Sequence, residues 1–190
     1  MDIKTTVTVT QETPWKRALN AARRTIGKEP IDKEPSNNWK AGVLLAEHSP
    51  IRLLTYTIRF TDIPYFIVMH FTRHCIGTIH FVKSQREDRS ETHAKRSDLP
   101  QDAPVDYEMV ANAQALINIS RKRLCNQAAK ETREAWEEAV DLISKADPVI
   151  GSVLVPECIY RGFCPENNCC GYVNTEEYKK RLEEYRKVDK

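Results

Sequence analysis

The sequence predicts an α+β fold with a central, mostly antiparallel sheet flanked by helices. Two segments, 2–10 and 53–60, alternate between apolar and polar residues, as strands with one buried face do. Several longer segments instead repeat apolar residues every three or four positions, which is typical of amphipathic helices. With 190 residues, 41% of them hydrophobic and 29% charged, the chain is long enough to form a domain with a sizeable core.

The N-terminal part is expected to contain a strand and two helices. After the strand at 2–10, Thr13 and Pro14 are expected to open a helix, with threonine as its N-cap and proline in the first turn. Gly27 is a natural end for this helix. A polar, proline-containing loop follows, and the apolar spacing predicts a second helix from about Asn38 to Glu47.

The middle of the chain continues with the strand at 53–60. A helix is then expected from about Asp62 to His74, ending near Gly77, and its apolar residues surround it so fully that it should be buried. Residues 83–104 form the most polar segment. This segment is expected to be a solvated loop, with a functional lid or binding loop as the alternative.

The C-terminal part is predicted to be mostly helical. Helices are expected over about 106–127 and 130–145, and a last helix begins after a cap at Thr175. We expect two units: a main domain over residues 1–150, and a cysteine-containing extension over residues 151–190 that ends in a helix.

Charge and hydropathy narrow the function classes. The formal charge of +2 gives no support to a nucleic-acid-binding protein, which usually carries a large basic excess. No apolar segment approaches the roughly 18 residues needed to cross a bilayer. The N-terminus also lacks the apolar region of a secretory signal. These features predict a cytosolic protein without a membrane partner.

The stretch from His70 to Arg86 concentrates polar chemistry behind an apolar helix. His70 and His74 are four residues apart and His80 follows, which invites a three-histidine zinc site. However, no glutamate lies between the first pair, and Arg73 would place a cation beside the metal.

A phosphate is a better fit to this stretch. Arg73 and Arg86 offer forks of donors and Ser84 a hydroxyl, as anion sites require. The alternative is that these arginines are surface residues paired with the acidic side chains that follow.

The predicted helix at 106–127 carries a second polar set, Asn112, Asn118 and Arg123. Six residues correspond to about 600° of helical rotation, so the two asparagines point about 120° apart. A ligand would therefore have to lie along the helix or around its end.

Four cysteines lie within thirteen positions of the C-terminal extension: Cys158, Cys164, Cys169 and Cys170. Such a cluster in a reducing compartment is more often a metal site, or a set of free thiols, than a disulfide framework. Zinc, or an iron–sulfur cluster, is the candidate metal. The spacings do not match the short C-x₂-C pattern of most zinc sites.

Taken together, the two polar sets resemble the flavin-dependent thymidylate synthase family, as a short, phage-like and divergent member. The family has a His-x-Thr-Pro segment, a helix ending in Gln-x-x-Arg-His-Arg, a serine- and arginine-containing stretch, and a helix carrying Asn-Ala-Arg. The corresponding residues here are His48-Ser49-Pro50, His70 to Cys75, Ser84-Gln85-Arg86, and Asn112-Ala113-Gln114 with Asn118 and Arg123. The match runs in the same order over residues 13–143.

This resemblance implies a fold like that of the thymidylate synthase complementing proteins and the methylation of dUMP to dTMP. FAD would be the cofactor, with NADPH and methylenetetrahydrofolate as cosubstrates. It also implies a homotetramer whose active sites are shared between subunits.

The resemblance further implies roles for individual residues. Arg123 would be catalytic, because it would lie against the uracil and favour ionisation of its N3. The nucleotide would contact His70, Arg73, Ser84, Gln85, Arg86 and Arg123. FAD would contact Ser49, Arg73, His74, Cys75, Asn112, Gln114 and Asn118.

The chain also departs from the family pattern. Cys75 replaces the second arginine of Arg-His-Arg, and His70 replaces the upstream glutamine. Only 25 residues separate Arg86 from Asn112, whereas the family has a longer insert that contributes another phosphate-binding arginine. Two alternatives follow: a non-catalytic nucleotide-binding or metal-stabilised interaction protein, and a related pyrimidine hydroxymethyltransferase.

Overall fold

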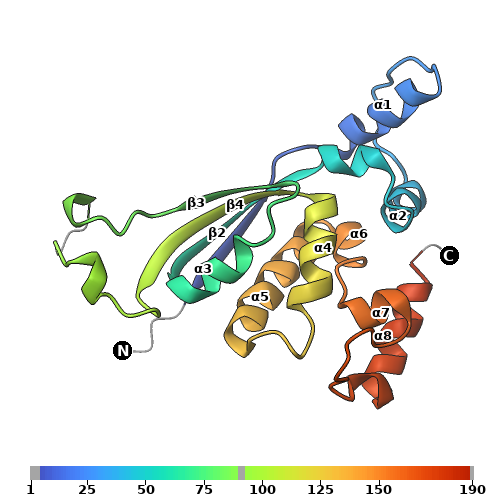
Figure 1. Cartoon of the computed structure of the whole chain (residues 1–190). Helices are drawn as coiled ribbons and strands as arrows, with labels where there is room; N and C mark the ends of the chain where they lie inside the picture. Colours follow the sequence, from blue (N-terminus) through green and yellow to red (C-terminus); the bar gives the residue numbers. More distant parts are fainter. Residues whose placement is uncertain (1–4, 90–92, 189–190) are drawn as a thin grey trace.

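A computed structural model describes residues 5–89 and 93–188 and contains a four-stranded antiparallel sheet (Figure 1). The strands are β1 (Thr6–Gln11), β2 (Thr55–Pro64), β3 (Thr78–Val82) and β4 (Pro104–Asn112), in the spatial order β1-β2-β4-β3. The predicted α+β class with an antiparallel sheet is therefore confirmed. Residues 2–4 of the predicted first strand lie outside the described ranges.

The described helices lie between and after the strands. They are α1 (Trp15–Thr25), α2 (Asn37–Leu45), α3 (Tyr65–Phe71), α4 (Ala113–Arg123), α5 (Lys130–Ala146), α6 (Pro148–Gly151), α7 (Glu157–Arg161) and α8 (Glu176–Arg186), with a 3-10 helix, η1 (Ser49–Leu53). In the part of the chain that is described, no helix is long and apolar enough to span a membrane.

One face of the sheet carries the core. Phe60 of β2 and Tyr107 of β4 stack with ring centroids 5.7 Å apart, and Phe71 of α3 stacks on both of them. Trp136 of α5 packs against Phe71 with a centroid distance of 5.6 Å. These aromatic contacts fix α3 and α5 on the same face, because they bury large planar surfaces in preferred stacking geometries.

The predicted helix over 106–127 is wrong in its first part. Residues 104–112 form β4, between β2 and β3, and α4 begins only at Ala113. Val105, Tyr107, Met109 and Ala111 are all buried and alternate with more exposed residues. The period of two belongs to a strand, and the pairing with two neighbouring strands outweighs the helical spacing that the same residues also permit.

Two other predicted helix ends are corrected. The helix expected over 62–74 is α3, which is shorter at both ends. It begins only at Tyr65, because β2 extends to Pro64, and it ends at Phe71. One side of α3 is also open, since Met69 is 48% exposed. Thr13 does not cap α1: its hydroxyl is bonded to that of Thr55 at 2.6 Å, and Pro14 occupies the cap position.

The last part of the chain has a small core of its own. Val153 and Leu154 still belong to the main core, whereas Val155, Ile159 and Tyr178 form a second cluster between α7 and α8. These two helices lie together beyond α4 and α6 (Figure 1). A cluster of three buried residues provides little hydrophobic stabilisation for a segment of this length.

Candidate functional site

The loop between α3 and β3, residues 72–77, is fixed to the start of α4. The backbone N–H of Asn112 donates to the carbonyl of Gly77 at 2.9 Å. Gly77 has φ +76°, and a Cβ at this position would lie 2.7 Å from the Asn112 amide nitrogen. Only glycine fits both the left-handed backbone and this close approach. The loop therefore presents Arg73 and His74 at a defined place beside α4.

A chain of hydrogen bonds also holds this loop on the sheet. The buried Tyr107 hydroxyl lies 2.7 Å from Nδ1 of His80, and Nε2 of His80 lies 2.9 Å from the carbonyl of His74. A carbonyl only accepts, so Nε2 of His80 carries the proton and Tyr107 donates to Nδ1. The Thr78 hydroxyl donates to the same His74 carbonyl.

Arg123, the last residue of α4, reaches this loop. Its Nε donates to Nε2 of His74 at 3.0 Å, and one terminal nitrogen donates to the carbonyl of His70 at 2.6 Å. His74 must accept at Nε2 and so carries its proton on Nδ1. Burial, together with the charge of Arg123, lowers the pKa of His74 to about 4. The imidazole is therefore neutral near pH 7.

His70 is held from the opposite side. Its Nδ1 lies 2.7 Å from the hydroxyl of Thr132, a fully buried residue of α5. Burial and the charges of Arg123 and Arg73 lower the pKa of His70 as well. Ring nitrogens of all three histidines are thus engaged in hydrogen bonds. Within the described ranges no three His, Cys, Asp or Glu side chains are arranged to hold a metal ion.

The charge of this cluster is positive and is not balanced locally. Burial and the neighbouring Arg73 both lower the pKa of Arg123. Among the described residues neither Arg73 nor Arg123 forms a salt bridge with a carboxylate. A partly buried guanidinium without a counter-charge is costly, so Arg123, with the exposed Arg73 nearby, favours an anionic ligand.

The other polar residues of α4 point away from Arg123. Gln114 and Arg123 are nine residues apart, about 900° of rotation, and lie on opposite sides of the helix. The Gln114 amide donates to Glu47, and Arg121 forms an ion pair with the same carboxylate. Asn118 accepts from Arg121 at 3.5 Å. The expected set is therefore split between two sides of α4.

The Glu47 side of α4 is a structural ion pair. Burial raises the pKa of Glu47, but hydrogen bonds from Arg121 and Gln114 outweigh it and lower the pKa overall. The Arg121 guanidinium also stacks on the ring of Tyr160, 3.5 Å from its centroid. This network joins Glu47, two residues before η1, to α4 and α7.

Four other expected residues lie elsewhere. Ser84, Gln85 and Arg86 follow the far end of β3, and Arg86 forms a bidentate pair with Asp88 at 2.8 Å. At about 3.3 Å per residue they are roughly 20 Å from Thr78, which contacts His74. Ser49 lines a groove between α1, α2 and η1. A single chain does not bring these residues to Arg123.

Cys75 is exposed in the same loop as Arg73. Its thiol contributes no hydrogen bond to the described network. The position that the resemblance assigns to a second arginine therefore adds no charge here.

Thr132, Tyr107 and Glu47 were missed by the reasoning from sequence. Thr132 is a buried threonine in the first turn of α5, and a polar residue on the apolar stripe of a helix is a usable signal. Tyr107 offers no such signal, because residues 106–127 are predicted to form a helix rather than a strand. Glu47 has φ +49°, a backbone conformation that nothing in its neighbours indicates.

Part of the chain is similar in sequence to a known protein family. Residues 87–149 match the family model described as thymidylate synthase complementing protein. This segment includes β4, α4 and α5, and therefore Asn112, Arg123 and Thr132. No curated protein sequence matches the chain significantly.

Solved structures match over most of the chain. A UMP/dUMP methylase, PolB from Streptomyces cacaoi bound with 5-Br dUMP, aligns with a TM-score of 0.64 and 15% identity, covering 84% of this chain and 96% of that chain. Thymidylate Synthase X from Helicobacter pylori with FAD and dUMP aligns with a TM-score of 0.63 and 16% identity, covering 78% and 99%. The predicted thymidylate synthase complementing protein-like fold is confirmed, and the family resemblance is confirmed by the model match over residues 87–149.

Proposed function

We propose that this protein methylates C5 of dUMP to give dTMP, as a flavin-dependent thymidylate synthase. The observation that carries the proposal is the Arg73–Arg123 pair, two guanidiniums without a carboxylate partner in the described part of the chain. An anionic nucleotide supplies the missing negative charge. The likeness to a UMP/dUMP methylase and to a thymidylate synthase, each solved with a nucleotide, supports the same substrate class.

Arg123 is proposed to act on the base. Neutral His74 and the carbonyl of His70 hold its guanidinium by two bonds, and the remaining N–H groups of Arg123 can donate to the uracil. A fixed cation beside a ring nitrogen favours the ionised form of that nitrogen. Ionisation at N3 enriches the ring in electrons and so activates C5 for attack on a one-carbon donor.

His74 and His70 are positioning residues in this scheme. A protonated imidazole could not accept from Nε of Arg123, so the low pKa of His74 keeps the arginine in place at neutral pH. Thr132 in turn fixes the ring of His70. Pre-organised donors of this kind need no reorganisation during the reaction.

The residues of the loop at 72–77 fit an anionic cofactor such as FAD. Arg73 is exposed and can reach a pyrophosphate, and exposed loop backbone lies beside it. Of the other expected contacts, Oδ1 of Asn112 already caps α4 at Ala115, and the amide nitrogen of Gln114 already donates to Glu47. Bound flavin would supply the electrons, drawn from NADPH, that reduce a methylene group from methylenetetrahydrofolate to methyl.

A second copy of the chain is needed to complete this site. Ser84, Gln85 and Arg86 are too far from Arg123 in one chain, so they are proposed to bind the nucleotide phosphate in a neighbouring subunit of a homotetramer. Their position after the far end of β3, where Arg86 is exposed, supports this arrangement. The uncovered face of β3, with Phe81 54% exposed, provides apolar surface for such an interface.

A related pyrimidine nucleotide is the second candidate substrate, because PolB is a UMP/dUMP methylase. The test incubates the purified full chain with FAD, NADPH, methylenetetrahydrofolate and either dUMP or UMP, and weighs the products by mass spectrometry. A gain of one methyl group on dUMP supports the proposal. Methylation of UMP alone supports the second candidate.

Two controls make this result decisive. Arg123→Ala should abolish product formation while the far-ultraviolet circular dichroism spectrum stays unchanged. Absence of flavin binding in a fluorescence titration, together with absence of product, would contradict the proposed activity; if the same chain still bound dUMP, it would be a nucleotide-binding protein without this activity. A hydroxymethyl product would identify the related transferase.

A further inference from the structure

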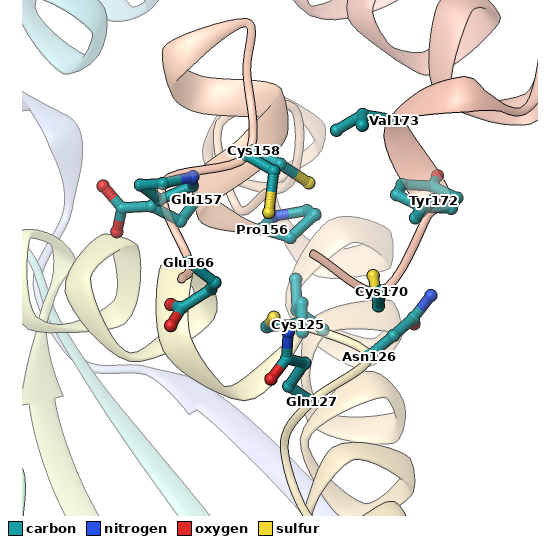
Figure 2. Close-up of a pocket in the computed structure, with 13 residues that line it drawn as sticks. Cys125, Asn126, Gln127, Pro156, Glu157, Cys158, Glu166, Cys170, Tyr172 and Val173 are labelled. Carbon is teal, nitrogen blue, oxygen red and sulfur yellow. The ribbon is translucent and has the colours of Figure 1, made fainter. Parts of the chain in front are cut away.

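Four thiols from three parts of the chain border one pocket. Cys125 follows α4, Cys158 lies in α7, and Cys164 and Cys170 lie in the segment between α7 and the 3-10 helix Tyr172–Asn174. In Figure 2 the labelled cysteines Cys125, Cys158 and Cys170 stand around this pocket on separate segments. All four are free cysteines.

A backbone amide of this segment donates to a sulfur atom. The N–H of Gly171 donates to Sγ of Cys169 at 3.4 Å. Cys169 itself does not line the pocket, but the next residue, Cys170, does. Backbone amides that donate to sulfur are common around cysteine metal sites.

The segment from Gly162 to Gly171 has no regular secondary structure. Both glycines have positive φ, +78° and +83°, the left-handed conformation that glycine adopts without strain. Its described hydrogen bonds to the rest of the protein include one from the Gln127 amide to the carbonyl of Asn168. Together with the small core between α7 and α8, this leaves the fold here in need of a cross-link.

We propose that this pocket binds one Zn²⁺ ion through Cys125, Cys158, Cys164 and Cys170. Four thiolates form a closed tetrahedral set, which is the preferred environment of structural zinc. The four thiols release their protons to solvent as the metal binds, and no oxidation is involved. The sequence cluster alone does not predict this set, because Cys125 lies 33 residues before Cys158 and Cys169 is not a ligand.

The four sulfur atoms lie too far apart to coordinate one ion as they stand. In the described part of the chain no group of three candidate side chains is close enough to hold a metal, so zinc must draw the sulfurs inward. The irregular segment allows this for Cys164 and Cys170. The half-buried Cys158 thiol loses its proton as the metal binds, because a bound dication stabilises the thiolate.

The partners of the metal belong to two parts of the fold. Cys125 comes two residues after Arg123 at the end of α4, whereas the other three ligands belong to the C-terminal extension. The ion would therefore fasten the extension to α4. The site does not depend on the proposed methylation, and its test has no activity readout.

The test measures zinc in the full chain, purified without chelators, by plasma mass spectrometry. One zinc per chain is expected, and Co²⁺ exchanged into the site should give the charge-transfer and ligand-field bands of tetrahedral cobalt thiolate. Cys125→Ser should reduce the affinity for Zn²⁺ at least tenfold in a chelator competition, and Cys170→Ser should do the same. Absence of both zinc and cobalt binding by the unmodified chain would overturn the proposal.

Two matched variants provide the controls. Cys75→Ser, at an exposed cysteine outside the pocket, and Cys169→Ser, beside it, should keep the full metal content. A loss of metal in Cys169→Ser but not in Cys170→Ser would overturn the assigned ligand set. If a pocket variant is insoluble, removal of zinc from the unmodified chain by a chelator provides the second measurement: thermal unfolding should shift to lower temperature, and an unchanged midpoint would contradict a structural metal.

Discussion

A guanidinium held by a neutral imidazole is the central feature of the candidate site at the scale of single residues. Arg123 is half-buried, lacks a carboxylate partner among the described residues, and directs two of its donors to His74 and to the carbonyl of His70. Both acceptors are uncharged, so the full positive charge of Arg123 remains available to a ligand. A carboxylate in the same place would have neutralised the site.

Arg123→Lys tests whether the forked geometry matters beyond the charge. Lysine is a single point charge and cannot donate to both acceptors while also reaching a base. We expect kcat/KM for dUMP methylation to fall at least about 100-fold, roughly 2.7 kcal/mol of transition-state stabilisation. Urea unfolding should change by less than about 1 kcal/mol. Arg24→Lys, at an exposed position in α1, is the control, and equal activities for the two variants would contradict the role of Arg123.

The low pKa of His74 predicts a loss of stability in mild acid. The unfolded chain binds a proton at an ordinary histidine pKa near 6.5, whereas folded His74 binds it only at about 4. The unfolded state therefore holds more protons between these values, and the free energy of unfolding falls as the pH is lowered through this window. Because His74 is half-exposed, solvent screening reduces its share to about 1 to 2 kcal/mol.

The measurement compares urea unfolding at pH 7 and pH 4.5 for the parent and for His74→Gln. Glutamine can still accept from Arg123 but does not titrate, so the variant should lose less stability on acidification than the parent. Glu47, whose pKa is lowered overall, contributes equally to both proteins and cancels in the comparison. An identical pH dependence for parent and variant would show that His74 takes up its proton at an ordinary pKa.

At the scale of elements, the predictable parts are those in which one residue pattern has one interpretation. β2, α2, α5 and α8 were all predicted: each has a single clear period or, for α8, the Thr175 cap, whose hydroxyl accepts from Tyr178 at 3.2 Å. β3 could not be predicted in this way. It is an edge strand whose inward residues, Thr78 and His80, are polar while its outward Ile79 and Phe81 are apolar, so its pattern is inverted.

The candidate site is likewise predictable only where its residues lie in one short sequence motif. The pairing of Arg73 and His74 with Arg123 was expected from the resemblance, because both sets lie on short, local motifs. The split of α4 between Arg123 and the Glu47 side was not expected, since the error in the helix start concealed the true faces. Cys125 was also missed as a partner of the other cysteines, because only the fold brings the end of α4 to the extension.

Gly77→Ala tests the attachment of the 72–77 loop to α4. Alanine would have to adopt φ +76° and would place its Cβ 2.7 Å from the Asn112 amide. We expect a destabilisation of about 2 to 3 kcal/mol, from backbone strain plus the displacement of Asn112. Gly27→Ala is the matched control, because Gly27 has φ +68° but nothing within 4 Å of an added Cβ.

The difference between these two glycine variants isolates the contact with Asn112. Gly27→Ala should cost only the strain of its backbone, about 1 kcal/mol. Gly77→Ala should also lower the methylation rate, since it displaces the loop that carries Arg73 and His74. If urea unfolding shows equal losses and the methylation assay shows equal rates, the close approach to Asn112 is not required.

At the scale of the whole molecule, one sheet face is covered by helices and the other is not. Ile79 and Phe81 on the uncovered side are 58% and 54% exposed, beside the exposed ion pair of Arg59 and Glu108. Apolar residues on an edge strand favour association unless a partner covers them. The same strand leads to Ser84 and Arg86, so an interface here could carry these residues into a neighbouring subunit.

Subunit complementation tests whether active sites are shared in this way. Arg123→Ala and Arg86→Ala should each be inactive alone, because each removes one half of every site. Co-expressed in equal amounts, they should regain about a quarter of the parent activity, since a site built from two subunits then receives both intact halves in about one case in four. Mass photometry of the mixture checks that the two chains assemble together, and Phe81→Glu should lower both the assembled mass and the activity. Persistent inactivity of a correctly assembled mixture would place Arg86 and Arg123 in the same half of the site or exclude Arg86 from it.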